Sequence, residues 1–517
     1  MGVNSLLPWN WFRSQPRRTA DPGATLKAAV QSLMARYDSA QTTDDNSRHW
    51  SMADGMSANT ANSHAVRATL RNRSRYECGN NCYARGIVQT IANHTIGSGP
   101  RLQLRTGNKQ ADKSIKKSLK KWFKEVRLPE KLRTLVQARV GDGEGFGVKV
   151  YNPKLKHAVK LDLRLFEAEM CTSQYNSTID EKKVDGVDFD DFGNVKQFWI
   201  LKDHPGGLGT LGNSWNPIAH SPENVIHLFK ATRAGQARGI PEITPALPLF
   251  AQLRRYTLAV IAAAEIAALI SVYLKTTGQV AHSEVTPWID FDLQRNAGMV
   301  LPDGWDMGQF KAEQPITTYS EFKTEVLNEI ARCVDMPLNI AACNSNNASF
   351  SSGKLDHLTY GNSIAIDRQQ IEDVVLDSLL LSWLEEAMLI PGLIPEGLPP
   401  ISDWEWEWQW DAMKVGDPLK EEAAIDLRLR NGTSSVPHEL EEQGYDWEAI
   451  IEAQAEFFEV TPAEVKKAIF NSLYSDGMKV AADHLANDAN STLAEQAARS
   501  IKDKFSKSGM SKKQSAA

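Results

Sequence analysis

The stretch from His227 to Leu274 most constrains what this chain can fold into. It joins a basic turn, RAGQARG, to a long segment that contains no helix breaker after Pro248. From Leu249 to Lys275 the residues are mainly Ala, Leu, Ile and Val, which predicts one helix of roughly 40 Å at about 1.5 Å per residue. A helix that is apolar on nearly all sides must be buried, either in lipid or against many neighbours.

Two features of this segment favour burial in an assembly over burial in lipid. The nineteen residues from Tyr256 to Leu274 have the length of a membrane span, but Glu265 lies at their centre, where a carboxylate costs roughly 2.5–3.5 kcal/mol. Alanine contributes little to insertion and lets helix axes approach closely. Residues 1–22 contain no continuous apolar run, so we expect no signal peptide. A ring of identical helices would bury this segment without lipid.

The overall charge excludes a protein coated with nucleic-acid-binding residues. The 517 residues carry a formal net charge of −6, which still leaves room for a local basic patch. The five cysteines are scattered, and Cys78 and Cys82 have no second pair at zinc-like spacing. We therefore expect free thiols in a reducing cytoplasm.

Helices are predicted to precede a region of strands in the first part of the chain. Ser63 to Ile96 is predicted to be helical and to end at the Gly97–Pro100 stop. Lys109 to Arg133 is predicted to form an amphipathic helix, and residues 135–230 are predicted to be rich in strands.

The amphipathic helix carries its apolar and basic residues on opposite faces. The apolar face contains Ile115, Leu119, Trp122, Phe123 and Val126. The basic face contains Lys113, Lys116, Lys117, Lys120, Lys121 and Lys124. A solvated face is the favoured interpretation, and a surface for phosphate or an acidic partner remains open.

Two glycine-containing segments are expected to have structural roles and not to bind ligands. Gly141–Gly147 resembles a phosphate-binding loop superficially, but it lacks the Lys-Ser/Thr pair, so we expect a flexible entry into a strand. The RAGQARG turn is expected to be a structural hinge.

No motif for catalysis is found. Asp185, Asp188, Asp190 and Asp191 form a carboxylate cluster that would suit a two-metal nuclease. Aspartate and glycine at this position are also ordinary turn residues, which is the favoured interpretation. Metalloprotease, nucleophile-elbow, Walker and EF-hand motifs are missing from the sequence. We expect no enzyme, no cofactor and no metal site.

The second half of the chain alternates helices with short polar segments. A helix is predicted from Tyr319 to Val334, a polar loop from Cys343 to Gly353, and a long helix from Lys354 to Leu389. Trp404 to Trp410 alternates tryptophan with polar residues, which predicts a strand with one buried aromatic face and leaves a carbohydrate platform open. Residues 417–485 are predicted to be helical.

These segments occur together in one known family, because the chain resembles the lambda-type portal proteins of tailed double-stranded DNA phages. The resemblance covers about residues 55–455 in consistent order. The matching segments are LRNRSRYECGNNCYARGIVQTIANHTIGSG, GDGEGFGV, RAGQARGIPEITPAL with its Ala-rich helix, NNASFSSGKLDHL and GDPLKEEAAIDLRLRNGTSS.

The resemblance implies an α+β portal fold with a β-rich wing, long stem helices, a small clip and a helical crown, assembling into a ring. Both ends are expected to be loosely structured. By chain order the implied regions are an N-terminal extension at 1–59, wing at 60–244, stem helix at 245–277, clip at 278–318, stem helix at 319–337, tunnel loop at 338–353, wing at 354–416, crown at 417–485 and a disordered basic tail at 486–517.

The resemblance also implies which residues contact DNA and partners. The tunnel-loop candidates are Asn344, Ser345, Asn346, Asn347, Ser349, Ser351, Ser352 and Lys354. The stem-packing candidates are Leu253, Tyr256, Ile261, Glu265 and Leu269. The clip candidates for docking terminase or adaptor proteins are Trp288, Asp290, Asp292 and Arg295.

The implied function is a channel for packaging and ejecting double-stranded DNA at one capsid vertex of the virion. The implied partners are eleven further copies of the chain, the large terminase subunit, capsid and scaffold proteins, and head-completion adaptors, with assembly in the host cytoplasm. An acidic protein suits a channel because many phosphate contacts would hold DNA in place. The alternative is a peripheral-membrane or interaction scaffold that uses the Ala-rich and basic helices.

Overall fold

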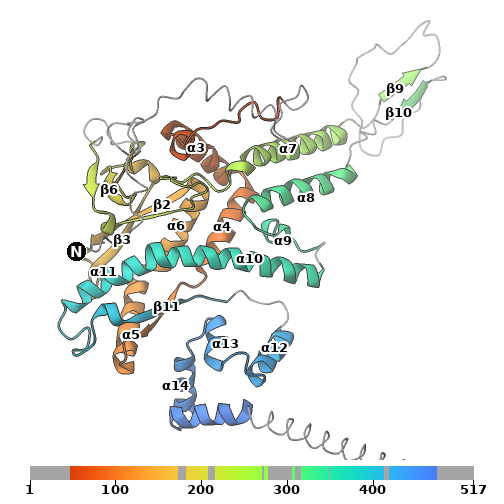
Figure 1. Ribbon diagram of the computed structural model, residues 1–517. Helices are drawn as coiled ribbons and strands as arrows, with labels where there is room; N and C mark the ends of the chain where they lie inside the picture. The colour runs from red at the N-terminus through yellow and green to blue at the C-terminus, as the bar shows by residue number, and fades with distance from the viewer. Residues whose placement is uncertain are drawn as a thin grey trace, which may run out of the picture. The chain divides into compact units, whose positions relative to one another are not determined.

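The computed structural model describes residues 47–172, 182–207, 216–269, 273–276, 305–308, 316–346, 349–412 and 418–473. Met1–Ser57 and Ala58–Ala517 form separate compact units. Helices and sheets both contribute to the second unit, as the α+β prediction requires (Figure 1).

The first helical region is divided in two. The short helix α2 (Ala58–Ala61) precedes this region, and its two helices are α3 (His64–Asn80) and α4 (Cys82–Ile96). The break lies at Asn81, whose side-chain oxygen accepts hydrogen bonds from the backbone amides of Tyr83 at 3.0 Å and Ala84 at 3.4 Å. An asparagine that caps a new helix interrupts the old one. The predicted stop is confirmed, because α4 ends before Gly97, which has a φ of 54°.

Two further helices follow, α5 (Lys109–Glu125) and α6 (Leu128–Asp142). The predicted apolar face of α5 is confirmed, since Ile115, Leu119 and Trp122 are buried. Strands were expected from residue 135 onward, and this was wrong for the start of the region. Residues of α6 fall at helical spacing and bury one face: Leu128, Leu132, Leu135, Val136 and Val140.

Two antiparallel sheets follow α6. The first has the order β3-β2-β8 and the second has the order β4-β5-β6-β7. The strands are β2 (Glu144–Tyr151), β3 (Leu161–Phe166), β4 (Lys183–Val184), β5 (Val187–Phe189), β6 (Val195–Ile200), β7 (Ile218–His220) and β8 (Val225–Phe229).

The Ala-rich helix is shorter than predicted. It forms α7 (Leu247–Leu269), and the chain is a strand again at β9 (Tyr273–Thr276), which pairs antiparallel with β10 (Trp305–Gly308). The extension to Lys275 was wrong because Tyr273–Thr276 pair with a distant strand. Helix α8 (Ile316–Cys333) then packs beside α7 (Figure 1).

The longest helix of the described residues is built from three segments. After the short α9 (Leu338–Ala341) come α10 (Phe350–Ile371), a π-helical turn (Glu372–Leu376) and α11 (Asp377–Met388) without interruption. The helix begins four residues before the predicted Lys354, because Ser349 caps it by accepting a hydrogen bond from the Ser352 amide at 3.2 Å.

The tryptophan-rich strand is β11 (Glu405–Gln409), which pairs antiparallel with β1 (Arg101–Arg105). The indoles of Trp406 and Trp408 both donate to Asp377 at the start of α11, at 2.9 and 2.8 Å. The indole of Trp410 donates to Glu372 at 2.6 Å. The predicted single aromatic face is therefore confirmed, and it lies against the long helix.

Helices predicted near the C-terminal end are confirmed as far as residue 473. They are α12 (Pro418–Arg430), α13 (Val436–Glu442), α14 (Trp447–Phe458) and a further segment at 462–473. Ile451, Ala455 and Val465 form a small core there that is separate from the main one. Among the described residues, no helix is long and apolar enough to cross a membrane.

Candidate functional site

The polar loop before α10 presents uncharged side chains to solvent. Asn344, Ser345 and Asn346 are exposed, and the turn is held by two hydrogen bonds. The Asn344 amide donates to the Asn339 carbonyl at 3.0 Å, and the Asn346 amide donates to the Asn344 side chain at 3.0 Å. Asn344–Asn346 therefore form a hydrogen-bonded turn whose polar side chains are exposed to solvent.

The loop is narrower than the predicted span of 338–353, because helices occupy both ends of that span. Ser349 caps α10, and Ser352 and Lys354 lie exposed in its first turns. Ser351 also belongs to α10, while Asn347 lies outside the described residues. The predicted loop candidates thus divide into loop and helix residues.

The two helices predicted to form the stem pack through aromatic rings, from the middle of α7 to the first turns of α8. The Tyr256 ring lies 5.6 Å from that of Tyr319 and 5.0 Å from that of Phe322. The Tyr319 hydroxyl donates to the Thr257 hydroxyl at 3.2 Å. Leu253 is buried in the main core. Leu253 and Tyr256 therefore pack within the chain.

Other predicted stem residues face outward. Ile261 is 49% exposed and Glu265 is also exposed. Leu258, which was not among the predicted residues, is 61% exposed on the same helix. The side chain of Leu269 lies outside the described part of the chain, as do the clip candidates Trp288, Asp290, Asp292 and Arg295.

A buried charged cluster lies where the two glycine-containing segments meet, and it was not predicted from the sequence. Glu144 is fully buried at the start of β2, and Arg238 of the RAGQARG turn forms a forked ion pair with it. The Arg238 Nε and Nη2 atoms donate to the two Glu144 oxygens at 2.8 and 2.7 Å. Arg71 lies 3.1 Å from the same carboxylate, and His227 lies 3.0 Å from it.

Arg238 also joins backbone segments that are distant in the sequence. Its guanidinium donates to the carbonyls of Cys171 at 3.0 Å and Ala168 at 3.1 Å, and to the carbonyl of Asp185. The hinge expected at RAGQARG is therefore wrong. This turn is fixed by a buried arginine that uses its planar fork of donors.

Burial and ion pairing compete at the cluster. Burial alone would raise the pKa of Glu144, but Arg238 and His227 outweigh it and hold the pKa well below its usual range. Burial lowers the pKa of His227, despite the nearby Glu144. Burial would likewise raise the pKa of Asp185, but His64, Arg238 and Arg67 lower it. The cluster thus holds ionised carboxylates beside a neutral imidazole.

The aspartate cluster that would suit a two-metal nuclease is not assembled as one site. Asp185 pairs with Arg67 and His64. The remaining carboxylates each have partners from their own sheet or turn. Asp188 accepts from Gln197 and Trp199, Asp190 accepts from Asn194, and Asp191 pairs with Lys182. Among the described residues, these four carboxylates therefore form no shared two-metal site.

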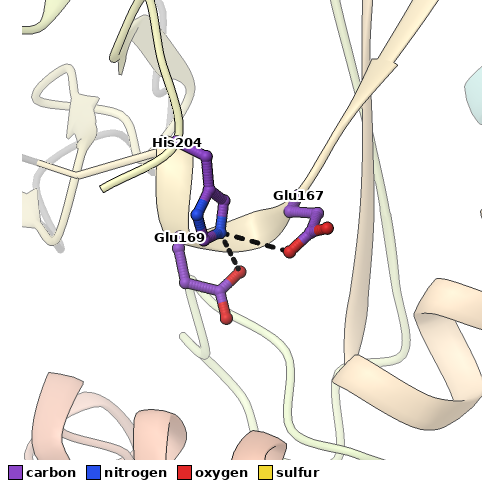
Figure 2. A group of neighbouring side chains, drawn as sticks. All are labelled: Glu167, Glu169 and His204. Atoms are coloured by element: carbon purple, nitrogen blue, oxygen red, sulfur yellow. Dashed lines mark ion pairs between the residues drawn. The ribbon is translucent and has the colours of Figure 1, made fainter. Parts of the chain in front are cut away.

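A group with metal-ligand chemistry does form at Glu167, Glu169 and His204 (Figure 2). The His204 Nε2 atom lies 3.2 Å from the Glu167 carboxylate and 3.8 Å from that of Glu169. Arg75 forms ion pairs with both acids, at 3.2 Å from Glu167 and 2.8 Å from Glu169, and it also pairs with Asp142. A cation is thus supplied by the protein itself.

A family model described as phage portal protein, lambda family, matches residues 43–367, which is more than half of the chain. The chain belongs to the lambda family of phage portal proteins. The match includes the polar loop, α7, α8 and the buried cluster, and ends within α10. No curated protein matches the sequence.

Solved structures of gene transfer agent particles are similar to this portal family member. A chain of the virion of a native particle is 14% identical, covering 74% of this chain and 93% of that one, with a TM-score of 0.45. A chain of the neck of an empty particle, computed with C6 symmetry, is 14% identical, covering 74% and 94%, with a TM-score of 0.47.

The glycines around the buried cluster were the signal that could have revealed it. Gly143 has a φ of 96°, and a Cβ atom there would overlap the backbone of Ile240. A Cβ atom on Gly239 would overlap the Gly143 carbonyl oxygen. Both glycines are needed because the segments carrying Glu144 and Arg238 approach backbone to backbone.

Proposed function

We propose that this protein forms a ring-shaped channel at one capsid vertex, through which double-stranded DNA is packaged and later ejected. Membership of the portal family over residues 43–367 carries the proposal. In this role the ring docks the terminase motor and then the head–tail connector proteins. The protein acts as a structural part of the virion and not as an enzyme.

The outward face of α7 supports assembly with further copies of the chain. Leu258 and Ile261 are exposed beside alanines of the same helix, Ala262 and Ala264. Contiguous exposed apolar residues mark interaction surfaces, and small residues let helices approach closely. A ring provides each α7 helix with neighbours, and twelve copies is the number that the family resemblance implies.

The polar loop before α10 supports a role in guiding DNA. Its exposed amides and hydroxyls form weak contacts with phosphates and read no base sequence. Few fixed positive charges at the channel wall suit translocation, because each neutralised phosphate adds salt-dependent affinity. The loop thus contacts DNA without holding it.

The substitution Asn346→Asp tests this role. A carboxylate repeated around the ring repels phosphates at close range, by about 1 kcal/mol per pair at 4 Å in bulk water and more in a confined channel. We expect several-fold fewer DNA-filled heads, measured by electron microscopy of heads assembled with the variant. Rings of the purified variant should form as in the unsubstituted protein.

Asn346→Ser is the matched control, because it keeps an uncharged polar group at the same position. Normal filling of heads by the Asn346→Asp variant would contradict the loop's role. A purified protein that is a monomer and associates only with lipid vesicles would contradict the channel itself and favour the scaffold alternative.

A further inference from the structure

Helix α5 uses the first half of its basic face within the chain. Three of its lysines lie against acidic residues at the start of α14. The pairs are Lys109–Glu448 at 3.7 Å, Lys113–Glu452, and Lys116–Asp446 at 3.3 Å. The chain's own carboxylates therefore neutralise this half of the basic face.

The second half of the same face forms an open lysine row, which we define as Lys117, Lys120, Lys121 and Lys124. All four side chains are exposed. None forms an ion pair with another residue in the part of the chain that the structure describes. Lys117 to Lys124 spans about 10 Å along the helix axis.

The loop between β2 and β3 extends the open lysine row. Lys154 and Lys156 are exposed in this loop. Glu125 at the end of α5 accepts hydrogen bonds from the backbone amides of Lys156 and, at 2.9 Å, His157. This acid thus fixes the loop beside the helix, and its oxygens are occupied by backbone donors.

Electrostatic repulsion between the lysines of the open lysine row favours binding of an anionic ligand. Like charges three or four residues apart on a helix destabilise it, and Lys117–Lys121 and Lys120–Lys124 are such pairs. Acidic residues that would relieve the repulsion are missing between Lys113 and Lys124. A polyanion would offset the repulsion along the whole row.

We propose that the open lysine row binds the phosphate backbone of double-stranded DNA. This second surface is separate from the polar loop before α10, which we call the channel loop from here on. The charge is complementary, and lysine suits phosphate as a flexible point charge. An acidic protein partner fits less well, because lysine is depleted from protein interfaces and an aromatic or arginine anchor is missing from the row. Binding of this kind requires no base contacts.

The open lysine row and the channel loop lie near positions of the long helix that are far apart. The Phe123 ring of α5 stacks on Trp408 at 6.2 Å, and Trp408 donates to Asp377 at the start of α11. The channel loop precedes Phe350, twenty-seven residues earlier along the helix, which corresponds to about 40 Å. DNA bound at the row is therefore not the segment in contact with the loop.

The double substitution Lys120→Gln with Lys124→Gln tests the proposal in the full-length protein. Affinity for a short labelled duplex of mixed sequence is measured by fluorescence anisotropy between about 50 and 200 mM salt. Each lost phosphate contact reduces the slope of log K against log salt by about 0.9, so we expect a decrease of about 1.8. Glutamine maintains the helix.

Lys183→Gln with Lys196→Gln is the matched control, because it removes two exposed lysines from the small sheet β4–β7. Its slope should equal that of the unsubstituted protein. Equal slopes for both double variants would overturn the proposal. Polyglutamate serves as a probe for an acidic protein partner. If the Lys120→Gln/Lys124→Gln variant loses polyglutamate binding but keeps duplex binding, the proposal is overturned and the row is assigned to an acidic protein. Neither result affects ring formation, so the channel function is tested independently.

Discussion

Two basic segments of this protein differ in whether their charged side chains are buried or exposed. The RAGQARG turn contains Arg238, which is 1% exposed and shares its charge with Glu144, whereas the lysines of α5 remain at the surface. Arginine provides a planar set of donors that matches a buried carboxylate, while lysine is strongly hydrated and favours solvent. The difference indicates that the first segment organises the fold and the second remains available to partners.

The largest effect is expected at the buried pair. Arg238→Met leaves Glu144 buried without its main partner, and removing one member of a buried pair costs about 3–5 kcal/mol. The urea midpoint of unfolding measures this loss. Arg233→Met is the control, because Arg233 lies exposed in the same turn. Similar urea midpoints for Arg238→Met and Arg233→Met would contradict the structural role assigned to the buried arginine.

The buried cluster should also make stability dependent on pH. The folded state lowers the pKa values of Glu144, Asp185 and His227, so it binds fewer protons than the unfolded chain. Stability is therefore complete above the unfolded pKa values and decreases as pH falls. The loss should begin below about pH 6.5 for the histidine and continue below about pH 4 for the carboxylates.

Urea midpoints measured from pH 7 to acid check this dependence. Asp185→Asn serves as a matched variant, because it removes one of the titrating carboxylates. It should lower stability at neutral pH and weaken the pH dependence in the acidic range. A midpoint that rises on acidification would contradict the ionised state assigned to the cluster.

The smallest effect is expected at the α5 surface. Lys116→Ala removes a partly exposed pair with Asp446, and such pairs contribute less than about 1 kcal/mol. The difference should decrease in high salt, because surface charges are screened. Lys117→Ala provides the comparison, as this neighbour forms no ion pair among the described residues. A loss as large as that of Arg238→Met would contradict the surface assignment of α5.

Local periodicity was sufficient to predict much of the fold. The buried face of α5 follows from the spacing of Ile115, Leu119 and Trp122, and the tryptophan strand follows from simple alternation. The end of α7 was not predictable in this way. Tyr273–Thr276 form β9 and pair with β10, and that pairing depends on residues far away in the chain.

The candidate site also has features that were predictable from local sequence and features that depend on distant residues. A polar loop at Cys343–Gly353 was predicted from composition, and Asn344–Asn346 are exposed there, whereas the loop's role in contacting DNA stays a prediction. Glu144 was not predicted to be a buried acid, because its partner Arg238 lies 94 residues away and the flanking glycines alone do not identify that partner. A charged residue between glycines predicts a turn unless the distant partner is known.

The π-helical turn at Glu372–Leu376 acts as a phase shift within the long helix. A π turn adds a residue to the helical repeat, and one residue corresponds to about 100° of rotation. Before the turn the helix buries a narrow stripe through Tyr360 and Ile364, and after it a wider one that includes Trp383. The angular setting of the channel loop relative to the tryptophan sheet is therefore determined by one inserted residue.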